Sequence, residues 1–154
     1  LAMPDTCVTL SPEQQGRLIQ GLAPVASNGK RQRRKNAPWQ MGDFSAAGGL
    51  YSTADDLMQF LAANIEPPAN LEYLELTRTV QHTVSDNLSV ALAWHITRSP
   101  TGHCIYQHSG LVGGYASFIA FEPQSKTGIF ILANAAVSVD EAAMAIFDKI
   151  LSKQ

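Results

Sequence analysis

QHSGLVGGY, residues 107–115, joins two apolar, strand-like runs through a pair of glycines. The first run ends in a basic residue, a hydroxyl and a glycine, at His108-Ser109-Gly110. Such a segment can place an imidazole ring that transfers protons, a hydroxyl and unpaired backbone N–H groups on one edge of a sheet. These groups make up half of an acyl-transfer site. The other half, a nucleophile with its base, is not evident elsewhere in the 154 residues.

The sequence on both sides of this segment predicts an antiparallel sheet. Apolar and polar residues alternate over residues 90–96 and 104–108, and each alternation is typical of a strand with one buried face. Residues 115–121 form the next predicted strand. Residues 128–133 are almost entirely apolar, which predicts a central strand covered on both faces. Short turns separate these runs and favour a meander.

A final helix is predicted to pack back across this meander. Ser138-Val139-Asp140-Glu141 has the pattern of a capping box, which predicts a helix over about residues 139–152. The predicted fold class is therefore α+β, with an antiparallel meander over about residues 90–134 and a packed C-terminal helix. The residues expected on the buried face of the helix are Ala142, Ile146, Phe147 and Ile150.

The N-terminal half is predicted to be mainly helix and loop. Ser11-Pro12-Glu13-Gln14 is typical of a helix start. Residues 23–47 are rich in Pro, Gly, Asn and charge, which predicts a long loop. Residues 52–56 cap a second predicted helix that Pro67-Pro68 ends, and residues 70–82 are predicted to form a third.

Length and composition fit one globular domain over residues 1–154. Hydrophobic residues make up 45%, and the net charge of −2 argues against nucleic-acid binding. No apolar run approaches the ~18 residues of a membrane span. Lys30–Lys35 is a basic cluster that fits either a phosphate or heparin patch or a solvated loop, and its flanking Gly29 and Pro38 favour the loop. Cys7 and Cys104 can form one disulfide, although two free thiols are favoured.

Each candidate motif also has a purely structural interpretation. His108-Ser109-Gly110 can be an ordinary strand end, and Gly48-Gly49 can pack tightly before a helix rather than bind an anion. Ser27-Asn28-Gly29-Lys30 matches a Ser-x-x-Lys nucleophile pattern, with Ser85-Asp86-Asn87 as a possible companion. That chemistry needs a helix turn that holds the lysine amine beside the serine in an apolar wall. Gly29 and the basic cluster predict a solvated loop instead, and Ser85-Asp86-Asn87 is typical of a turn.

No metal or cofactor site is predicted. The four histidines are dispersed and lack the spacing of a zinc site. The sequence contains neither a phosphate loop nor a dinucleotide-binding glycine fingerprint. We therefore expect the protein to use no metal and no cofactor.

Four segments, in this order, resemble segments of one family. Leu1–Thr6 resembles its Leu-Gly-Met-x-Asp-Thr segment, and Ala47–Leu57 resembles its Gly-Gly-Leu-x-Ser-Thr-x-x-Asp-Leu segment. His108-Ser109-Gly110 resembles its third active-site motif, Lys/His-Thr/Ser-Gly, and Phe121–Asn134 resembles its closing hairpin. The chain thus resembles, over nearly its whole length, the C-terminal portion of serine hydrolases of the class C β-lactamase, D-Ala-D-Ala carboxypeptidase and esterase group.

The resemblance implies a β-lactamase/transpeptidase-like fold and a specific chemistry. In this family a serine attacks an amide, lactam or ester carbonyl and forms an acyl-enzyme. By carry-over, His108 assists proton transfer and holds the substrate carboxylate, Ser109 hydrogen-bonds that carboxylate, and the Leu111 N–H binds the oxyanion. His108 and Ser109 are the expected catalytic residues. The residues expected to border the substrate are Gly110, Leu111, Gly113 and Gly114.

The chain departs from the family pattern in one large respect. The family's Ser-x-x-Lys and Tyr-x-Asn motifs normally precede the segment that Leu1–Thr6 resembles. We therefore expect an incomplete domain that is inactive alone and exposes apolar surface. The expected partner is an N-terminal portion or a second copy of the chain, and the alternative is a non-catalytic binding module.

The resemblance leaves the substrate open. β-Lactams, D-Ala-D-Ala peptides and esters all fit the family, and the histidine in the third motif favours the peptidase or esterase members. It also implies a periplasmic or secreted location.

Overall fold

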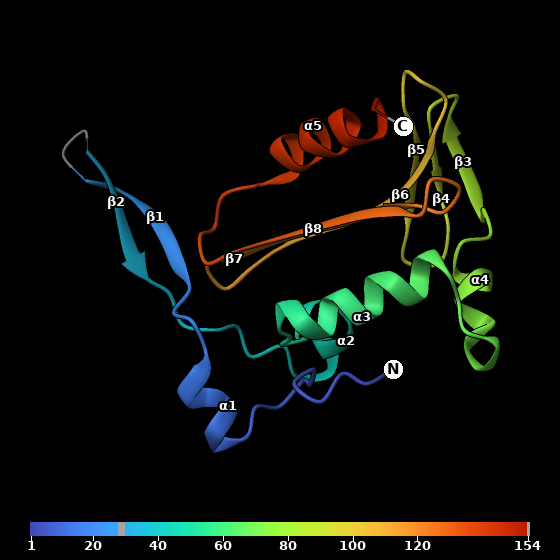
Figure 1. The fold of residues 1–154 in the computed structure, drawn as a ribbon. Coiled ribbons are helices and arrows are strands. Elements are labelled where there is room, and N and C mark those ends of the chain that lie inside the picture. Colours follow the sequence, from blue (N-terminus) through green and yellow to red (C-terminus); the bar gives the residue numbers. More distant parts are fainter. Residues whose placement is uncertain (28–29, 154) are drawn as a thin grey trace.

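The protein is built around an antiparallel sheet with one long helix on each face. The computed structural model describes residues 1–27 and 30–153, and for residues 25–27 and 30–32 it describes the backbone only. Figure 1 shows α5 (Asp140–Leu151) on one face of the sheet, α3 (Ala54–Ile65) on the other, and a separate hairpin that projects from the body. The predicted antiparallel sheet with a packed C-terminal helix is thereby confirmed.

The sheet is a six-stranded meander in which neighbours in sequence are neighbours in space. Its order is β3-β4-β5-β6-β7-β8, and all pairs are antiparallel. The strands are β3 (His82–Ser85), β4 (Leu88–Val90), β5 (His95–Arg98), β6 (Cys104–Val112), β7 (Tyr115–Glu122) and β8 (Thr127–Ala133).

The single strand predicted over residues 90–96 is wrong. β4 ends at Val90, β5 begins at His95, and between them the chain reverses through Ala93 at a φ of +66°. The alternation of apolar residues continues through this reversal, so period alone does not reveal it. A non-glycine residue at positive φ is uncommon, and alanine gives no sequence signal of a turn.

The predicted central position of β8 is also wrong, but its two covered faces are real. β8 lies last in the sheet order, and it packs against both α3 and α5. Gly128 begins this contact, because a Cβ there would lie 2.9 Å from the methyl carbons of Leu61. An almost fully apolar strand therefore indicates that other elements cover both of its faces. It does not indicate how many neighbouring strands it pairs with.

The start and the face of α5 differ from the predictions. The helix has no side-chain cap, and the Ser138 hydroxyl accepts from the Asp140 N–H at 3.2 Å instead of forming a capping box. The buried residues are Ala143, Phe147 and Leu151, whereas Ile146 and Ile150 are 48% and 38% exposed. Phe147 alone was placed correctly.

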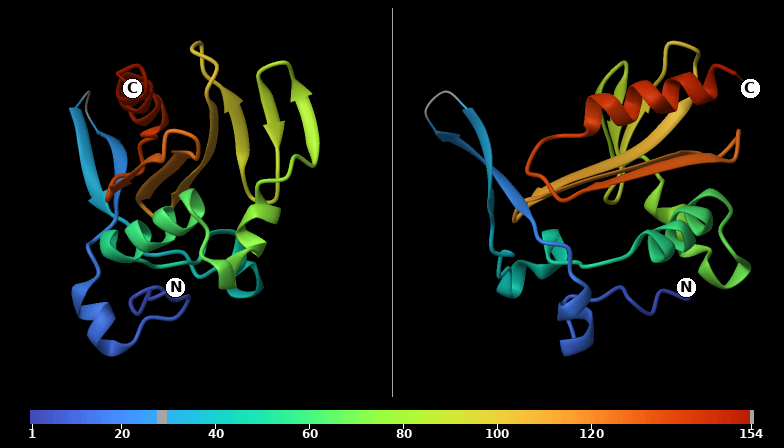
Figure 2. Two further views of the ribbon diagram at one scale, coloured as in Figure 1. Left: turned by 45° about the vertical axis from the view of Figure 1, so that its right-hand side comes forward. Right: turned by 60° about the vertical axis from the view of Figure 1, so that its left-hand side comes forward.

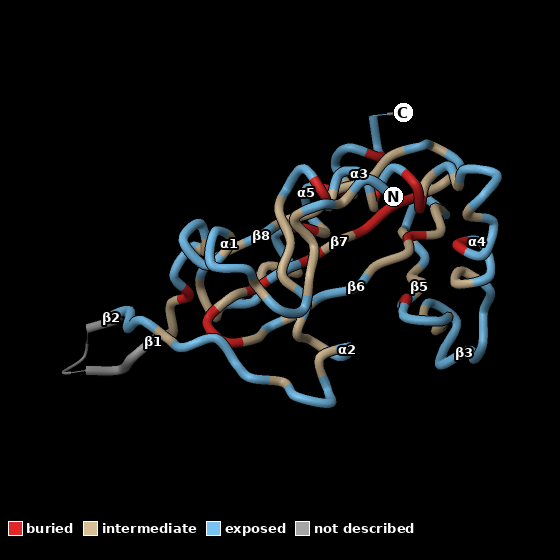
Figure 3. Tube along the Cα trace, turned by 90° about the horizontal axis from the view of Figure 1, so that it is seen from below, coloured by how far each residue is buried: buried red, intermediate tan, exposed pale blue. Residues whose placement is uncertain are grey.

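Each face of the sheet has its own core cluster. Ile105, Phe118 and Ala120 pack under α5, and Trp94 and Phe121 pack under α3 with ring centroids 5.0 Å apart. Figure 3 shows the buried residues gathered along β7 and the facing parts of the helices. Residues on opposite faces of β6 and β7 therefore belong to different clusters.

Residues 23–47 are not the predicted long loop. β1 (Leu22–Ser27) pairs antiparallel with β2 (Lys30–Lys35), and then follow a 3₁₀ turn (Gly42–Phe44) and α2 (Ser45–Gly48). The strand β2 was missed because lysine is depleted in strands and a basic run is typical of solvated loops.

The other N-terminal elements follow the sequence more closely. α1 (Pro12–Arg17) has the predicted capping box between Ser11 and Gln14, and α3 ends just before Pro67-Pro68. The helix predicted over residues 70–82 is too long, because only a 3₁₀ turn and α4 (Tyr73–Thr77) form before β3 begins. Within the described residues no helix is long and apolar enough to cross a membrane, and both cysteines are free thiols.

Candidate functional site

The C-terminal part of β6 extends beyond its neighbour β5. β5 pairs with β6 only over Cys104–Gln107, and its first residue, His95, lies opposite Gln107. From His108 to Val112, β6 pairs with β7 alone. In the described parts of the chain, this stretch of five residues therefore has one open edge, and it contains the whole His-Ser-Gly motif.

The turn after β6 determines which backbone groups reach that edge. Gly113 and Gly114 form a two-residue loop with φ of +56° and +90°, as a type I′ turn requires. In such a hairpin the closing pair, Val112 and Tyr115, exchanges backbone hydrogen bonds, and the hydrogen-bonded and non-bonded pairs then alternate. The N–H groups of Ser109 and Leu111 consequently point away from β7, towards the open edge.

The side chains of His108 and Ser109 are exposed on opposite faces of β6. His108 lies opposite Ile119, which belongs to the cluster under α3, and Ser109 lies opposite Phe118, which belongs to the cluster under α5. The ring, the hydroxyl and the N–H groups thus share one strand edge, with the ring and the hydroxyl reaching it from different sides.

His95 was missed by the sequence reasoning. Its ring stacks beside that of His108, with centroids 6.0 Å apart and an interplanar angle of 21°. No sequence motif links these two residues, because they come from different strands. The only available signal was the β5–β6 register, which depends on where β5 begins.

Gly113 and Gly114 are buried by other parts of the backbone. A Cβ on Gly114 would lie 2.8 Å from the Leu22 nitrogen, and one on Gly113 would lie 3.2 Å from the Trp39 nitrogen. The Leu22 N–H also donates to the Gly114 carbonyl at 3.0 Å. In this structure the two glycines hold the base of the β1–β2 hairpin, and so fix the end of the candidate edge.

The tyrosine nearest to His108 in sequence is not an activated base. Tyr106 stacks on Phe121 with ring centroids 5.2 Å apart, on the strand that carries His108. Burial raises the pKa of the Tyr106 hydroxyl above its ordinary value. Tyr106 therefore holds its proton at neutral pH, which is the opposite of what a general base requires.

The Ser-x-x-Lys pattern does not lie on a helix. Ser27 ends β1 and Lys30 begins β2, where they are antiparallel partners, and Asn28 and Gly29 lie outside the described residues. The prediction that Ser85-Asp86-Asn87 is a turn is confirmed, since Ser85 ends β3 and the next two residues form a tight turn.

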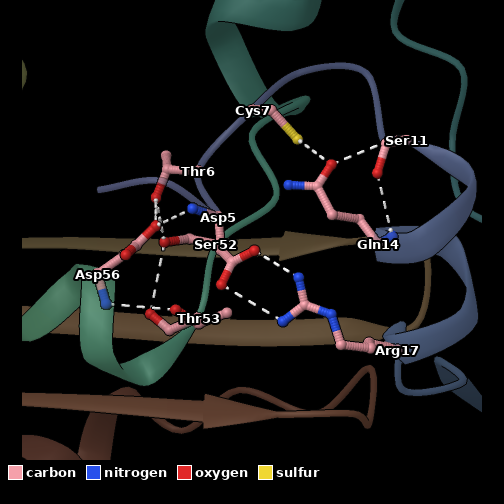
Figure 4. Close-up of polar contacts among 9 residues, drawn as sticks. All are labelled: Asp5, Thr6, Cys7, Ser11, Gln14, Arg17, Ser52, Thr53 and Asp56. Carbon is pink, nitrogen blue, oxygen red and sulfur yellow. Dashed lines mark hydrogen bonds and ion pairs between the residues drawn. The ribbon is translucent and has the colours of Figure 1, made fainter. Parts of the chain in front are cut away.

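Two of the family-like segments meet around one buried carboxylate (Figure 4). Asp56, only 4% exposed, accepts from the Asp5 N–H at 2.9 Å and from the Thr6 hydroxyl at 2.7 Å. Cys7 and Tyr51 continue the contact through two backbone hydrogen bonds. Asp56 is therefore an anchor that joins residues 1–7 to the start of α3, and it is remote in sequence from the β6 edge.

The Gly48-Gly49 pair lies in a packed corner next to a pocket. A Cβ on Gly48 would meet Met41 at 3.4 Å and Val112 at 3.6 Å. The pocket has a volume of about 270 Å³, and Trp39, Met41 and Tyr51 are among its lining residues. It therefore lies near the turn end of β6. Among the described residues no group of three potential metal ligands comes together.

A family model described as Beta-lactamase matches residues 1–152 of the chain. The chain belongs to the beta-lactamase family. No curated protein sequence matches it significantly.

Solved structures show the same beta-lactamase fold. A beta-lactamase/D-alanine carboxypeptidase from Pseudomonas syringae aligns with a TM-score of 0.73 at 20% identity, over 95% of this chain and 48% of that one. A class C beta-lactamase gives 0.74 at 20% identity, with coverages of 97% and 47%. An octameric penicillin-binding protein homologue from Pyrococcus abyssi gives 0.76 at 22% identity, with coverages of 97% and 34%. The chain thus spans about half or less of the structures that it matches.

Proposed function

We propose that this chain is the C-terminal portion of a serine hydrolase that works through an acyl-enzyme. The observation that carries the proposal is the open edge of β6, where His108, Ser109 and the Leu111 N–H lie together beyond the start of β5. Acyl transfer needs donors fixed at the position where the oxyanion develops, and a strand edge supplies them with little motion.

The reaction divides between this edge and a serine supplied by an N-terminal portion. The serine oxygen attacks the substrate carbonyl, the carbonyl oxygen becomes an oxyanion, and the Leu111 N–H donates to it. His108 assists the transfer of the serine proton to the leaving group and attracts the substrate carboxylate, which Ser109 hydrogen-bonds. Collapse expels the leaving group, and water then releases the acyl group from the serine.

The proposed substrates are a β-lactam, a D-Ala-D-Ala peptide or an ester. Gly110 keeps the strand narrow where the substrate approaches, and Gly113 and Gly114 shape the end of the site through the turn that they form. The proposed location, periplasmic or secreted, follows the family.

A non-catalytic binding module is the second candidate. The observation that favours it is the position of the only Ser-x-x-Lys pattern, which lies on the hairpin and not on a helix. In that case the open β6 edge binds a ligand or partner without catalysing a reaction. A stable, unreactive monomer would favour it.

A mixing experiment separates the two functions. The chain is combined with an N-terminal portion of the family, either on a separate chain or fused ahead of Leu1, and hydrolysis of a chromogenic β-lactam and of a short ester is measured. We expect the mixture to be active. His108→Ala should lower this activity by about two to four orders of magnitude, as the loss of a general acid–base group does. His82→Ala, which removes an exposed histidine from β3, is the matched control and should keep the activity. Equal activity of both variants contradicts the role of His108.

A further inference from the structure

The β1–β2 hairpin carries much of the positive charge of the chain. Five of the six residues of β2 are lysine or arginine, out of eleven in the whole sequence. The other six are outnumbered by thirteen acidic residues, and no acidic residue lies between Glu13 and Asp43. The chain is therefore divided into a cationic hairpin and an acidic body.

The hairpin presents its charge to solvent. It projects away from the sheet in the right-hand view of Figure 2, and Arg33, Arg34 and Lys35 are exposed. The ion pairs found among the described residues involve none of these three. Successive strand residues project to opposite faces, so Arg34 lies on one face and Arg33 and Lys35 on the other. The two-stranded sheet leaves the outer edge of β2 open, with described cations on both sides of it.

The cations are not what holds the hairpin in place. Its base is fixed by backbone hydrogen bonds, from the Leu22 N–H to the Gly114 carbonyl at 3.0 Å and from the Ala136 N–H to the Leu22 carbonyl at 2.8 Å. A run of like charges in a strand is unfavourable, because neighbouring cations repel and lysine is a poor strand former. The stability of the fold therefore does not account for the composition of β2.

We propose that the outer edge of β2 binds an acidic polysaccharide. A linear chain of carboxylates or sulfates can follow the edge and meet the cations of both faces, whereas a flat lipid surface meets one face. Leu22–Lys35 contains no aromatic residue on which nucleic-acid bases could stack. This inference goes beyond the proposed hydrolase function and does not depend on it.

Binding of fluorescent heparin oligosaccharides and galacturonate oligomers to the full chain tests the proposal. The first probe carries sulfates and the second only carboxylates, so the two distinguish the source of the charge. We expect the triple variant R33Q/R34Q/K35Q to bind on the order of tenfold more weakly, with a salt slope smaller by about 2, from ~0.7 for each cation lost. The matched control R98Q/K149Q/K153Q removes three exposed cations from the body and should bind as the unchanged chain does.

Two further measurements keep the test decisive. R33K/R34K, which keeps the charge, should retain binding. That result would show that the weaker binding of R33Q/R34Q/K35Q comes from the lost charge and not from a damaged hairpin. Duplex DNA and vesicles of equal parts phosphatidylcholine and phosphatidylglycerol are the competing ligands. Equal loss in the two triple variants, no binding of either oligosaccharide, or tighter binding of the duplex or the vesicles would overturn the proposal.

Discussion

Asp56 shows how a single side chain joins parts of the fold that are distant in sequence. Its carboxylate receives the Asp5 N–H and the Thr6 hydroxyl, and the Asp56 N–H donates to the Thr53 hydroxyl that caps α3. Such a buried acceptor is costly to lose, because the Asp5 N–H then loses its acceptor and the Thr6 hydroxyl keeps only its bond with the Ser52 hydroxyl. One of the four segments that resemble the family therefore also holds two distant parts of the fold together.

Replacing this carboxylate should destabilise the fold. We expect Asp56→Ala to lower the free energy of unfolding by about 2 kcal/mol, since partly buried donors lose a charged acceptor. Asp55→Ala, an exposed neighbour in the same first turn, removes the same charge near the helix N-terminus and should cost about 0.5 kcal/mol. Urea denaturation of both variants gives the comparison, and equal losses would show that Asp56 acts only through its charge.

The Asp5–Arg17 pair makes the stability of the fold depend on pH in acidic solution. The hydrogen bond from Arg17 lowers the pKa of Asp5 below its ordinary value. The stabilisation is therefore present above the ordinary carboxyl range, about pH 4, and is lost as pH falls through the lowered pKa. Carboxyl titration by NMR should show the pKa of Asp5 returning towards its ordinary value in Arg17→Gln, and an unchanged pKa would contradict the pairing.

At the scale of elements, the β6–β7 turn matters most for the candidate site. Its two glycines combine positive φ with close contact to the base of the hairpin, so the turn positions both the open edge of β6 and the cationic strand β2. A substitution there strains the backbone and disturbs the packing together.

The two contributions can be separated with a pair of glycines that have the same φ. Gly114 and Gly102 both have φ of +90°, but a Cβ on Gly102 meets nothing within 4 Å. We expect Gly102→Ala to cost about 1 kcal/mol from backbone strain alone and Gly114→Ala clearly more, about 2 kcal/mol or above. Chemical denaturation measures both, and equal costs would mean that the contact with Leu22 is not tight.

Elements with a local signal could be predicted from the sequence. The capped start of α1, the start and end of α3, and strands β6 and β7 follow from capping residues, prolines and alternation. The β1–β2 hairpin and the β4–β5 reversal could not, because their composition favours loops or a continuing strand. The site divides in the same way, since His108 stands in a motif and His95 reaches it only through strand register.

At the scale of the whole molecule, apolar surface remains exposed on several elements. Ile19, Phe44 and Leu50 are 67%, 74% and 61% exposed, which is a large exposed fraction for bulky apolar side chains. Ile19 follows α1, Phe44 ends the 3₁₀ turn before α2, and Leu50 follows α2. On the proposed function, these residues would meet an N-terminal portion or a second copy of the chain.

The chain alone should therefore self-associate. We expect sedimentation velocity to show a sedimentation coefficient that rises with concentration, and a hydrophobic dye to bind and then be displaced by an N-terminal portion of the family. A monomer at every concentration that does not bind the dye would show that the exposed residues form no interaction surface.

The central claim is that the open β6 edge completes an acyl-transfer site whose nucleophile lies on another portion. Labelling with a fluorescent penicillin, followed by denaturing electrophoresis, tests it most directly. We predict no label on this chain alone, label on the N-terminal portion when the two are mixed, and loss of that label with His108→Ala but not with His82→Ala. Covalent label on this chain itself would contradict the account and would make Ser27 the candidate nucleophile.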